Sequence, residues 1–348
     1  MKVLKNEPLK KHTSFRVGGP AKVYVIPEDD YELRKLIEFL YEEKLPYKII
    51  GNGTNLLVSD EGVDAIVVEI GKTLEGLTLT VEGQASEISC ADKQCTVTAS
   101  SGINSGIDAT IEKSGKKTKS GATDSDRKKS DKSTEEKDAN VYLLKVMAGT
   151  LIGKAAQFAA DNSLAGMEAL RGIPGTVGGA VTMNAGAYGT EMIDVLHSVD
   201  VITKEGKLLT LTPGELKLGY RYSIVPEKEY VVVSATFALK KGDKKEINAL
   251  MADYQQRRKD KQPIDKASAG STFKRPEGHF AGKLIEDCGL RGYKHGGAMV
   301  SEKHCGFVIN DGTARAADIY WLIGEIRKRV LLEQGVELTP EVKIWGNF

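Results

Sequence analysis

Apolar residues near the start of the chain follow two different spacings. Residues 21–26 form a short apolar run that ends at Pro27, which predicts a β-strand. From Glu28 onward, apolar residues recur three and four positions apart, which is the period of an α-helix. They are Leu33, Leu36, Ile37 and Leu40. This part of the chain is therefore predicted to form a strand and then a helix with one apolar face.

Two more strands are predicted over residues 47–50 and 65–70, which completes a compact βαβ-type unit. Between them lies the loop Gly51-Asn52-Gly53-Thr54-Asn55, at a strand end where such folds bind ligands. The loop lacks the lysine of a P-loop and the third glycine of the dinucleotide fingerprint. On its own it fits a tight turn as well as a site where backbone amides approach a diphosphate.

The second half of the chain also mixes helices and strands. Helices are predicted over residues 151–161 and 245–258, and strands over 195–203 and 230–239. Near the C-terminus, an apolar stripe at helical spacing predicts a long helix packed on the core. The stripe consists of Ile319, Leu322, Ile323, Ile326 and Val330.

Composition changes abruptly between residues 112 and 140. This segment has nine Lys and Arg and seven Asp and Glu, and its only apolar residues are Ala122 and Ala139. Because it cannot offset its ordering entropy by burial, it is predicted to be a mobile surface loop. Its mixed charge favours a solvated segment over an arm that binds nucleic acid. Just upstream, the alternation within residues 77–99 predicts a short hairpin.

The charges of the whole chain nearly cancel. Its 348 residues include 49 Lys and Arg and 48 Asp and Glu, for a net charge of +1. This balance argues against a protein held to nucleic acid or to an anionic membrane by a long-range field. No window approaches the ~18 apolar residues of a membrane span, and the first residues lack the apolar core of a signal peptide, so we expect a cytoplasmic protein. The four cysteines show no metal-ligand spacing, which favours structural thiols and no metal site.

The most informative part of the sequence is rich in glycine. It reads Arg171-Gly172-Ile173-Pro174-Gly175-Thr176-Val177-Gly178-Gly179-Ala180, and then Asn184-Ala185-Gly186-Ala187-Tyr188-Gly189. So many glycines between apolar residues imply a backbone that lies close to a flat or anionic ligand, because any Cβ would hold it off. Two glycine loops in one chain, both with hydrogen-bonding Asn, are hard to explain as turns alone.

These loops, together with Thr13-Ser14-Phe15-Arg16-Val17-Gly18-Gly19-Pro20-Ala21, resemble the UDP-N-acetylenolpyruvoylglucosamine reductase family. The resemblance covers most of the chain outside residues 83–140. It continues through residues 219–223, 269–276, 281–286, 301–304 and 340–342. The motif Gly296-Gly297-Ala298-Met299-Val300-Ser301 follows directly on the segment 290–295. The chain therefore resembles the branch of the family with the shorter substrate domain.

The resemblance implies an α+β protein with the FAD-binding fold of the vanillyl-alcohol-oxidase (PCMH) type and a C-terminal α+β substrate-binding domain. FAD-binding subdomain 1 is expected over residues 1–72, with a C-terminal strand from 337–348 that returns to it. Subdomain 2 is expected over 73–225, with the insertion at 83–140, and the substrate-binding domain over 226–336. The protein is expected to be a monomer.

The resemblance also implies a reaction in peptidoglycan synthesis, the reduction of UDP-N-acetylglucosamine enolpyruvate to UDP-N-acetylmuramate. FAD would be bound non-covalently and NADPH would be the co-substrate. The first glycine loop would cradle the FAD pyrophosphate and the second would line the flavin, so that backbone amides replace a basic patch. The implied cofactor-binding residues are Gly51, Asn52, Gly53, Thr54, Asn55, Ile173, Pro174, Gly175, Thr176, Gly178, Gly179, Ala180, Asn184, Ala185 and Gly186.

Three residues match catalytic positions of the family. Ser271 would donate a proton to C2 of the enolpyruvyl group after a hydride reaches C3. Arg221 would bind the substrate carboxylate with its planar fork, and Glu341 would act as a proton-bearing partner that stabilises the developing enol. Judged without the resemblance, Ser271 equally fits a turn residue, Arg221 fits a surface arginine stacked on a neighbouring tyrosine, and Glu341 fits the end of a strand.

Four further residues are expected to meet the carboxylate or the diphosphate of the substrate, namely Tyr188, Lys261, Lys274 and Arg275. Lys274 and Arg275 equally fit a solvated pair, and the family often carries Asn at the second position. His304 precedes a predicted buried strand at 306–310, which favours a structural role over that of an acid. Residues 257–259 are interpreted as a solvated helix end, with diphosphate binding as the alternative.

Two other classes of function remain open. One is a flavin- or nucleotide-binding sensor of the same fold without reductase activity. The presence of Arg221, Ser271 and Glu341 together favours the enzyme over the sensor. The other is an FAD oxidase of the wider fold, which is disfavoured because neither glycine loop contains a His or Cys that could tether flavin.

Overall fold

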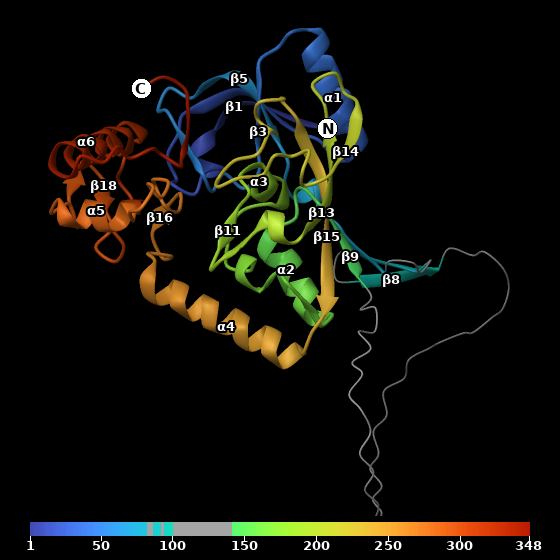
Figure 1. Ribbon diagram of the computed structural model, residues 1–348. Coiled ribbons are helices and arrows are strands. Elements are labelled where there is room, and N and C mark those ends of the chain that lie inside the picture. The colour runs from blue at the N-terminus through green and yellow to red at the C-terminus, as the bar shows by residue number, and fades with distance from the viewer. Residues whose placement is uncertain (82–85, 92–93, 100–140) are drawn as a thin grey trace, which may run out of the picture.

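The computed structural model describes residues 1–81, 86–91, 94–99 and 141–348 (Figure 1). The segment 112–140, predicted to be a mobile surface loop, lies outside these residues. No helix within the described ranges is both long enough and apolar enough to cross a membrane.

The N-terminal part contains the predicted βαβ unit. Its elements are β1 (Lys2–Pro8), η1 (Leu9–Lys11), β2 (Pro20–Ile26), α1 (Asp30–Glu42), β3 (Tyr47–Ile50), β4 (Leu56–Val58), β5 (Val63–Glu69) and η2 (Lys72–Leu74). Four strands form a sheet in the order β1-β2-β5-β3, in which β5 runs parallel to both β2 and β3. The side chain of Asp29 caps α1 by accepting a hydrogen bond from the Glu32 amide at 2.7 Å. All four apolar residues predicted for this helix are buried.

A larger antiparallel sheet follows. Its part of the chain comprises β6 (Leu77–Val81), β7 (Ser86–Ala91), β8 (Gln94–Ala99), β9 (Tyr142–Met147), α2 (Ile152–Asp161), β10 (Leu164–Ala165), η3 (Glu168–Leu170), α3 (Val177–Thr182), β11 (Gly186–Ala187), β12 (Thr190–Glu191), η4 (Met192–Asp194), β13 (Leu196–Ile202), β14 (Leu208–Leu211) and β15 (Val231–Lys241). The strand order is β14-β13-β15-β9-β6-β7-β8, with β10 paired to β15. Residues 77–99 therefore contain three successively paired strands, where a single hairpin was predicted.

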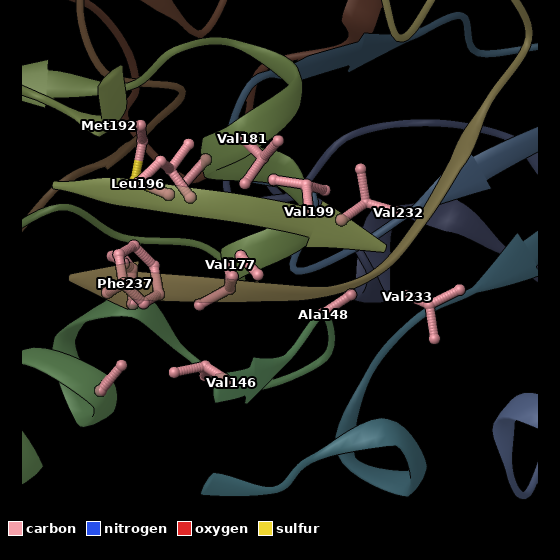
Figure 2. Packing of buried hydrophobic residues seen from close by; sticks show 14 of the residues in the cluster. Val146, Ala148, Val177, Val181, Met192, Leu196, Val199, Val232, Val233 and Phe237 are labelled. Atoms are coloured by element: carbon pink, nitrogen blue, oxygen red, sulfur yellow. The ribbon is translucent and has the colours of Figure 1, made fainter. Parts of the chain in front are cut away.

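The main core lies between this sheet and the short helices on it. Figure 2 shows Val177 and Val181 of α3 packed among side chains of β13 and β15, including Val199 and Phe237. Both valines and Phe237 are fully buried. This packing fixes α3, and with it the glycine-rich backbone that α3 contains, against the sheet.

The C-terminal part forms a second layered unit. It contains β16 (Ala267–Ser268), α5 (Ala281–Asp287), β17 (Lys294–His295), β18 (Ala298–Val300), β19 (Val308–Asn310) and α6 (Ala316–Gln334), with strand order β16-β19-β18-β17. The apolar stripe predicted for the last helix is buried along α6. The free thiols of Cys288 and Cys305 are buried in the same core, which agrees with the predicted structural role of cysteines. This core also takes in Phe15, Val17 and Leu57 from the N-terminal part.

Two elements connect the parts across the molecule. The helix α4 (Lys244–Lys261) runs from the end of β15 toward β16 (Figure 1). Its buried residues, Ile247 and Met251, lie in its N-terminal half. The last strand, β20 (Lys343–Trp345), returns to the N-terminal part and pairs in parallel with β4.

Candidate functional site

The first glycine loop, residues 51–55, joins β3 to β4. Gly53 has a left-handed backbone (φ +58°), and a Cβ at this position would overlap the carbonyl oxygen of His12. A residue other than glycine is therefore excluded by both backbone strain and lack of space. The amide of Ser14 donates to the Gly53 carbonyl at 3.1 Å, which ties the loop to the N-terminal segment.

The backbone amides of this loop have no hydrogen-bond acceptor among the described residues. None of the five N–H groups from Gly51 to Asn55 donates a hydrogen bond to another described residue. A row of unmet amide donors on a glycine-containing loop suits an anionic group such as a pyrophosphate. The donor set therefore fits the predicted contact with FAD.

The second glycine loop lies directly against the first. The Thr54 hydroxyl donates to the Pro174 carbonyl at 3.3 Å. A Cβ on Gly51 would collide with the hydroxyl of Thr176, which itself caps α3 by accepting from the Gly179 amide at 3.4 Å. The structure thus brings the two loops together, although more than 100 residues separate them in the sequence.

Two consecutive glycines of α3 have different surroundings. A Cβ on Gly178 would lie 3.1 Å from the Cβ of Ala148, so this glycine is needed for packing against the chain that follows β9. Gly179 is exposed, and a Cβ at this position would have the Thr176 hydroxyl in ordinary van der Waals contact at 3.7 Å. Protein packing therefore explains the first glycine and leaves open space above the second.

Asn184 is fully buried, and its side chain is occupied by the protein. Its amide nitrogen donates to a Glu191 carboxylate oxygen at 2.8 Å and to the Gly219 carbonyl at 3.0 Å. Its side-chain oxygen accepts from the Ile193 amide at 3.1 Å. These three hydrogen bonds brace the loop that ends at Gly186, and the predicted role of Asn184 in cofactor binding stays a prediction.

Arg221 and Glu341 form a partly buried ion pair, although they are 120 positions apart in the sequence. The Arg221 Nε lies 2.9 Å from Glu341 Oε1, and the side chains are 19% and 15% exposed. Arg221 Nη2 donates to the Gly186 carbonyl at 3.2 Å, whereas Nη1 is buried and has no hydrogen-bond partner among the described residues. The guanidinium thus retains a donor for a further anionic group.

Burial raises the pKa of Glu341 above the usual carboxyl value, and the charges of Arg221 and Lys274 only partly oppose this shift. A carboxyl group in this environment holds its proton at a higher pH than an exposed glutamate does. The structure therefore combines a fixed cation with a carboxyl group that can carry a proton.

Ser271 lies in the loop after β16, at an exposed position next to Gly270. The following residue, Thr272, accepts a hydrogen bond from the Glu341 amide at 2.8 Å through its carbonyl. Phe273 forms a bridge with Pro340. These backbone contacts place all three predicted catalytic residues in one region of the molecule.

The four predicted substrate contacts are more dispersed. The amide of Lys274 donates to the Thr339 carbonyl at 2.9 Å, which keeps this lysine beside Glu341. The guanidinium of Arg275 lies over the Phe280 ring at 4.6 Å, and Lys261 is exposed in the last turn of α4. Tyr188 lies at the tip of the β11–β12 hairpin and stacks on Tyr254 of α4.

The contacts of His304 fit the predicted structural role, which stays a prediction. Its Nδ1 accepts a hydrogen bond from the Gly306 amide at 3.1 Å, and burial lowers its pKa. The interpretation of residues 257–259 as a solvated helix end is right for Arg257, which is exposed and pairs with Asp253 at 2.7 Å. It is wrong for Arg258, whose Nε is buried because the side chain turns toward Gly172.

Two neighbours of Arg221 were not predicted. The Glu191 carboxylate lies 3.7 Å from Arg221 Nη1, and the Tyr220 ring lies 5.0 Å from the guanidinium. The Tyr220 hydroxyl also accepts from the Arg275 amide at 3.1 Å. Adjacency in sequence could have indicated Tyr220, whereas the approach of Glu191 depends on the β11–β12 pairing and has no local signal.

Family profiles match three stretches of the chain. The profile described as "FAD binding domain" matches residues 21–106 and 129–212. The profile described as "UDP-N-acetylenolpyruvoylglucosamine reductase, C-terminal domain" matches residues 262–345. These matches confirm the expected α+β fold, an FAD-binding fold of the vanillyl-alcohol-oxidase type with a separate C-terminal domain.

Similar proteins extend over almost the whole chain. A UDP-N-acetylenolpyruvoylglucosamine reductase of Agathobacter rectalis is 45% identical, with 99% of this chain and 95% of the relative covered. The corresponding protein of Caldanaerobacter subterraneus is 43% identical over 99% and 94% of the two chains. The crystal structure of UDP-N-acetylenolpyruvylglucosamine reductase from Thermus caldophilus is 31% identical and superimposes with a TM-score of 0.68, covering 99% of this chain and 98% of that one. The chain therefore belongs to the UDP-N-acetylenolpyruvoylglucosamine reductase family.

Proposed function

We propose that this protein reduces UDP-N-acetylglucosamine enolpyruvate to UDP-N-acetylmuramate with NADPH and FAD, a step of peptidoglycan synthesis. The observation that carries this proposal is the partly buried Arg221–Glu341 pair next to the two joined glycine loops. The pair offers a cation for a carboxylate and a carboxyl group with a raised pKa. A sensor that only binds flavin has no need for this pair.

FAD fits the residues that are present. The unused amides of residues 51–55 would hold its pyrophosphate, and the open surface over Gly179 would take the flat ring system. Bound FAD supplies the hydride relay between NADPH and C3 of the enolpyruvyl group. Asn184 would support this site indirectly, because its side chain fixes the loop that ends at Gly186.

The chain's own residues would manage charge and protons. Arg221 would bind the enolpyruvyl carboxylate through Nη1, which lies 3.7 Å from the Glu191 carboxylate and forms no hydrogen bond with the residues that the structure describes. Glu341, whose pKa is raised by burial, would stabilise the developing enol as a proton-bearing partner, and Ser271 would deliver a proton to C2. Tyr188, Lys261, Lys274 and Arg275 would bind the rest of the anionic substrate.

The proposal is tested by following the flavin spectrum without oxygen. The purified protein with FAD should be yellow, should bleach on addition of NADPH and should recover its colour with the enolpyruvyl substrate. A flavin that ignores NADPH would contradict the reductase. A flavin that is reduced but is not reoxidised by this substrate would favour another function of the same fold.

Ser271→Ala separates the two halves of the reaction. Flavin reduction by NADPH should be unchanged, because it needs no proton at C2. Reoxidation by the substrate should slow by about 10²–10⁴-fold, as expected for loss of a proton donor. Stopped-flow absorbance measures both rates, with Ser268→Ala in β16 as the matched control that leaves both unchanged. Equal slowing of the two halves would show that Ser271 has a different role.

The proposal also includes a monomer in the cytoplasm that acts on a UDP-sugar and NADPH and binds no nucleic acid. Size-exclusion chromatography with light scattering should give the mass of one chain. A mass of two or more chains would contradict this part without affecting the proposed reaction.

A further inference from the structure

Tyr188 occupies a strained position at the tip of a hairpin. The strands β11 and β12 pair Ala187 with Thr190, so Tyr188 and Gly189 are the two residues of the turn. Both have positive φ, at +52° and +86°. Gly, Asn and Asp normally occupy such turns, and a bulky residue there is strained. A tyrosine held in this conformation indicates that its side chain is needed at that place.

Helix α4 holds the Tyr188 side chain by two contacts. The ring stacks on Tyr254 with centroids 4.5 Å apart and planes 4° from parallel. The Tyr188 hydroxyl donates to the Tyr254 backbone carbonyl at 3.1 Å. One face of the ring is thus covered, and the residue remains 39% exposed.

Arg258 lies one helical turn beyond Tyr254 and completes this environment. A Cβ on Gly172 would lie 3.1 Å from its Nε and 3.3 Å from its Cζ, so the guanidinium rests directly on the backbone of the second glycine loop. The Nε is buried without a hydrogen-bond partner, and no carboxylate in the part of the chain that is described pairs with this arginine. Burial lowers its pKa, and the neighbouring Tyr188 opposes that change.

A buried guanidinium nitrogen without a hydrogen-bond partner is costly, so the retention of Arg258 Nε in this position calls for a role other than stability. Arg257, the adjacent residue, is exposed and forms an ordinary surface pair with Asp253. Arg258 and Tyr188 line the same small pocket, together with Gly172 and Tyr254, whereas Arg257 does not line it.

We propose that Arg258 is a positioning residue, which fixes Tyr188 against α4 so that the exposed part of this tyrosine meets the substrate in one orientation. The proposal rests on the proposed function, because it takes Tyr188 as a substrate contact. Arg258 sets the affinity for the UDP-sugar and leaves the chemical step to Arg221, Ser271 and Glu341.

The test compares steady-state kinetics of the FAD-loaded protein and its variants. Arg258→Met should raise the KM for the UDP-sugar about tenfold and leave kcat within about twofold, because binding and not the reacting centre is affected. Arg258→Lys should recover most of the loss, and Arg257→Met, the matched control, should behave like the wild type. The thermal midpoint and FAD content identify any variant that fails to fold, in which case Arg258→Lys against Arg257→Lys provides the comparison.

A double-mutant cycle shows whether Arg258 acts through Tyr188. Tyr188→Leu should raise the KM, and adding Arg258→Met to it should have little further effect, since coupled residues are not additive. Additive effects would mean that Arg258 binds the substrate directly and would overturn the positioning role, as would an unchanged KM in folded Arg258→Met. Failure of the proposed function would appear in the wild type, which would then neither oxidise NADPH nor turn over the substrate. Failure of the positioning role alone would appear only in the comparison of variants.

Discussion

Gly179 offers a direct test of where the flavin lies. Its surroundings in the protein are open, whereas Gly178 is closed against Ala148. Gly179→Ala should leave the apoprotein equally stable or raise its free energy of unfolding by about 0.5–1 kcal/mol, because alanine favours a helix over glycine. The same change should weaken FAD binding, since the new methyl group enters the space of the ring system. Urea unfolding and FAD titration measure the two effects.

Gly178→Ala is the matched control for that experiment. Its Cβ would approach the Ala148 Cβ to 3.1 Å, so it should destabilise the apoprotein itself. Equal FAD affinity in Gly179→Ala and wild type would show that the flavin does not cover this residue.

Glu341 predicts a characteristic pH dependence. Its folded pKa is raised above the ordinary value of 4.5, with burial as the main cause. A raised folded pKa stabilises the protein at low pH, and that contribution is lost as the pH rises through the folded pKa. Glu341→Gln has no group that titrates here, so its stability does not show this decrease. Its free energy of unfolding should therefore rise relative to that of the wild type as the pH increases above about 4.5. Parallel stability curves from urea unfolding would contradict the raised pKa.

The same titration should also affect the reaction. If the protonated carboxyl group stabilises the enol, the rate of flavin reoxidation by substrate should fall as the pH passes the raised pKa. The rate of flavin reduction by NADPH should not follow this titration.

Some contacts of single residues were predicted from the sequence and others were not. The glycine loops and the resemblance predicted which residues would come together, and the structure places Thr54 beside Pro174 and Arg221 beside Glu341. The burial of Arg258 and the bracing role of Asn184 could not be predicted, because each depends on segments that meet only after folding. A local sequence pattern predicts a helix or a strand, and it carries no information about which distant residues will lie beside it.

The same distinction holds for whole elements. The longer strands and helices were predicted because their apolar periodicity exceeds one turn or two alternations, as in α1 and α6. Strands of two or three residues, such as β4 and β16, were not predicted at these positions, whereas β20 lies within the C-terminal strand that the resemblance implied over 337–348. Their pairing depends on partners from distant parts of the chain, so their own sequences contain too few residues for a period to emerge.

Helix α6 depends on a cap from a distant segment. Asp60 accepts hydrogen bonds from the amides of Ala316 at 2.9 Å and Ala317 at 3.0 Å, the first two residues of the helix. Asp60→Ala should lower the free energy of unfolding by about 1 kcal/mol, through loss of both the cap and the favourable charge at the helix N-terminus.

Asp64→Ala is the matched control for the cap. This carboxylate is 87% exposed and pairs with Lys22 on the surface, so its loss should change stability by less than about 0.5 kcal/mol. Chemical unfolding of both variants gives the comparison, and equal effects would mean that the distant cap adds nothing beyond a surface charge.

For the whole molecule, sequence order and spatial order differ. The C-terminal core includes Phe15, Val17 and Leu57, so the segment expected to belong to the first FAD-binding subdomain also packs with the C-terminal unit.

The near-neutral net charge of the chain agrees with the proposed way of binding its ligands. A protein that handles several diphosphates through loop amides and a few placed cations does not need a large positive surface.

The C-terminal strand β20 supports the first glycine loop. The amide of Lys343 donates to the Asn55 carbonyl at 3.0 Å, and β20 pairs with β4 immediately after the loop. Deleting residues 343–348 removes this support but leaves Leu338 and Val342 in the core. The loop amides should then be less well oriented, so FAD affinity should fall by about tenfold, as measured by flavin fluorescence titration. Deleting only residues 347–348 keeps β20 and should preserve affinity, and an equal loss in both truncations would place the effect in the Phe348–Tyr320 stack instead.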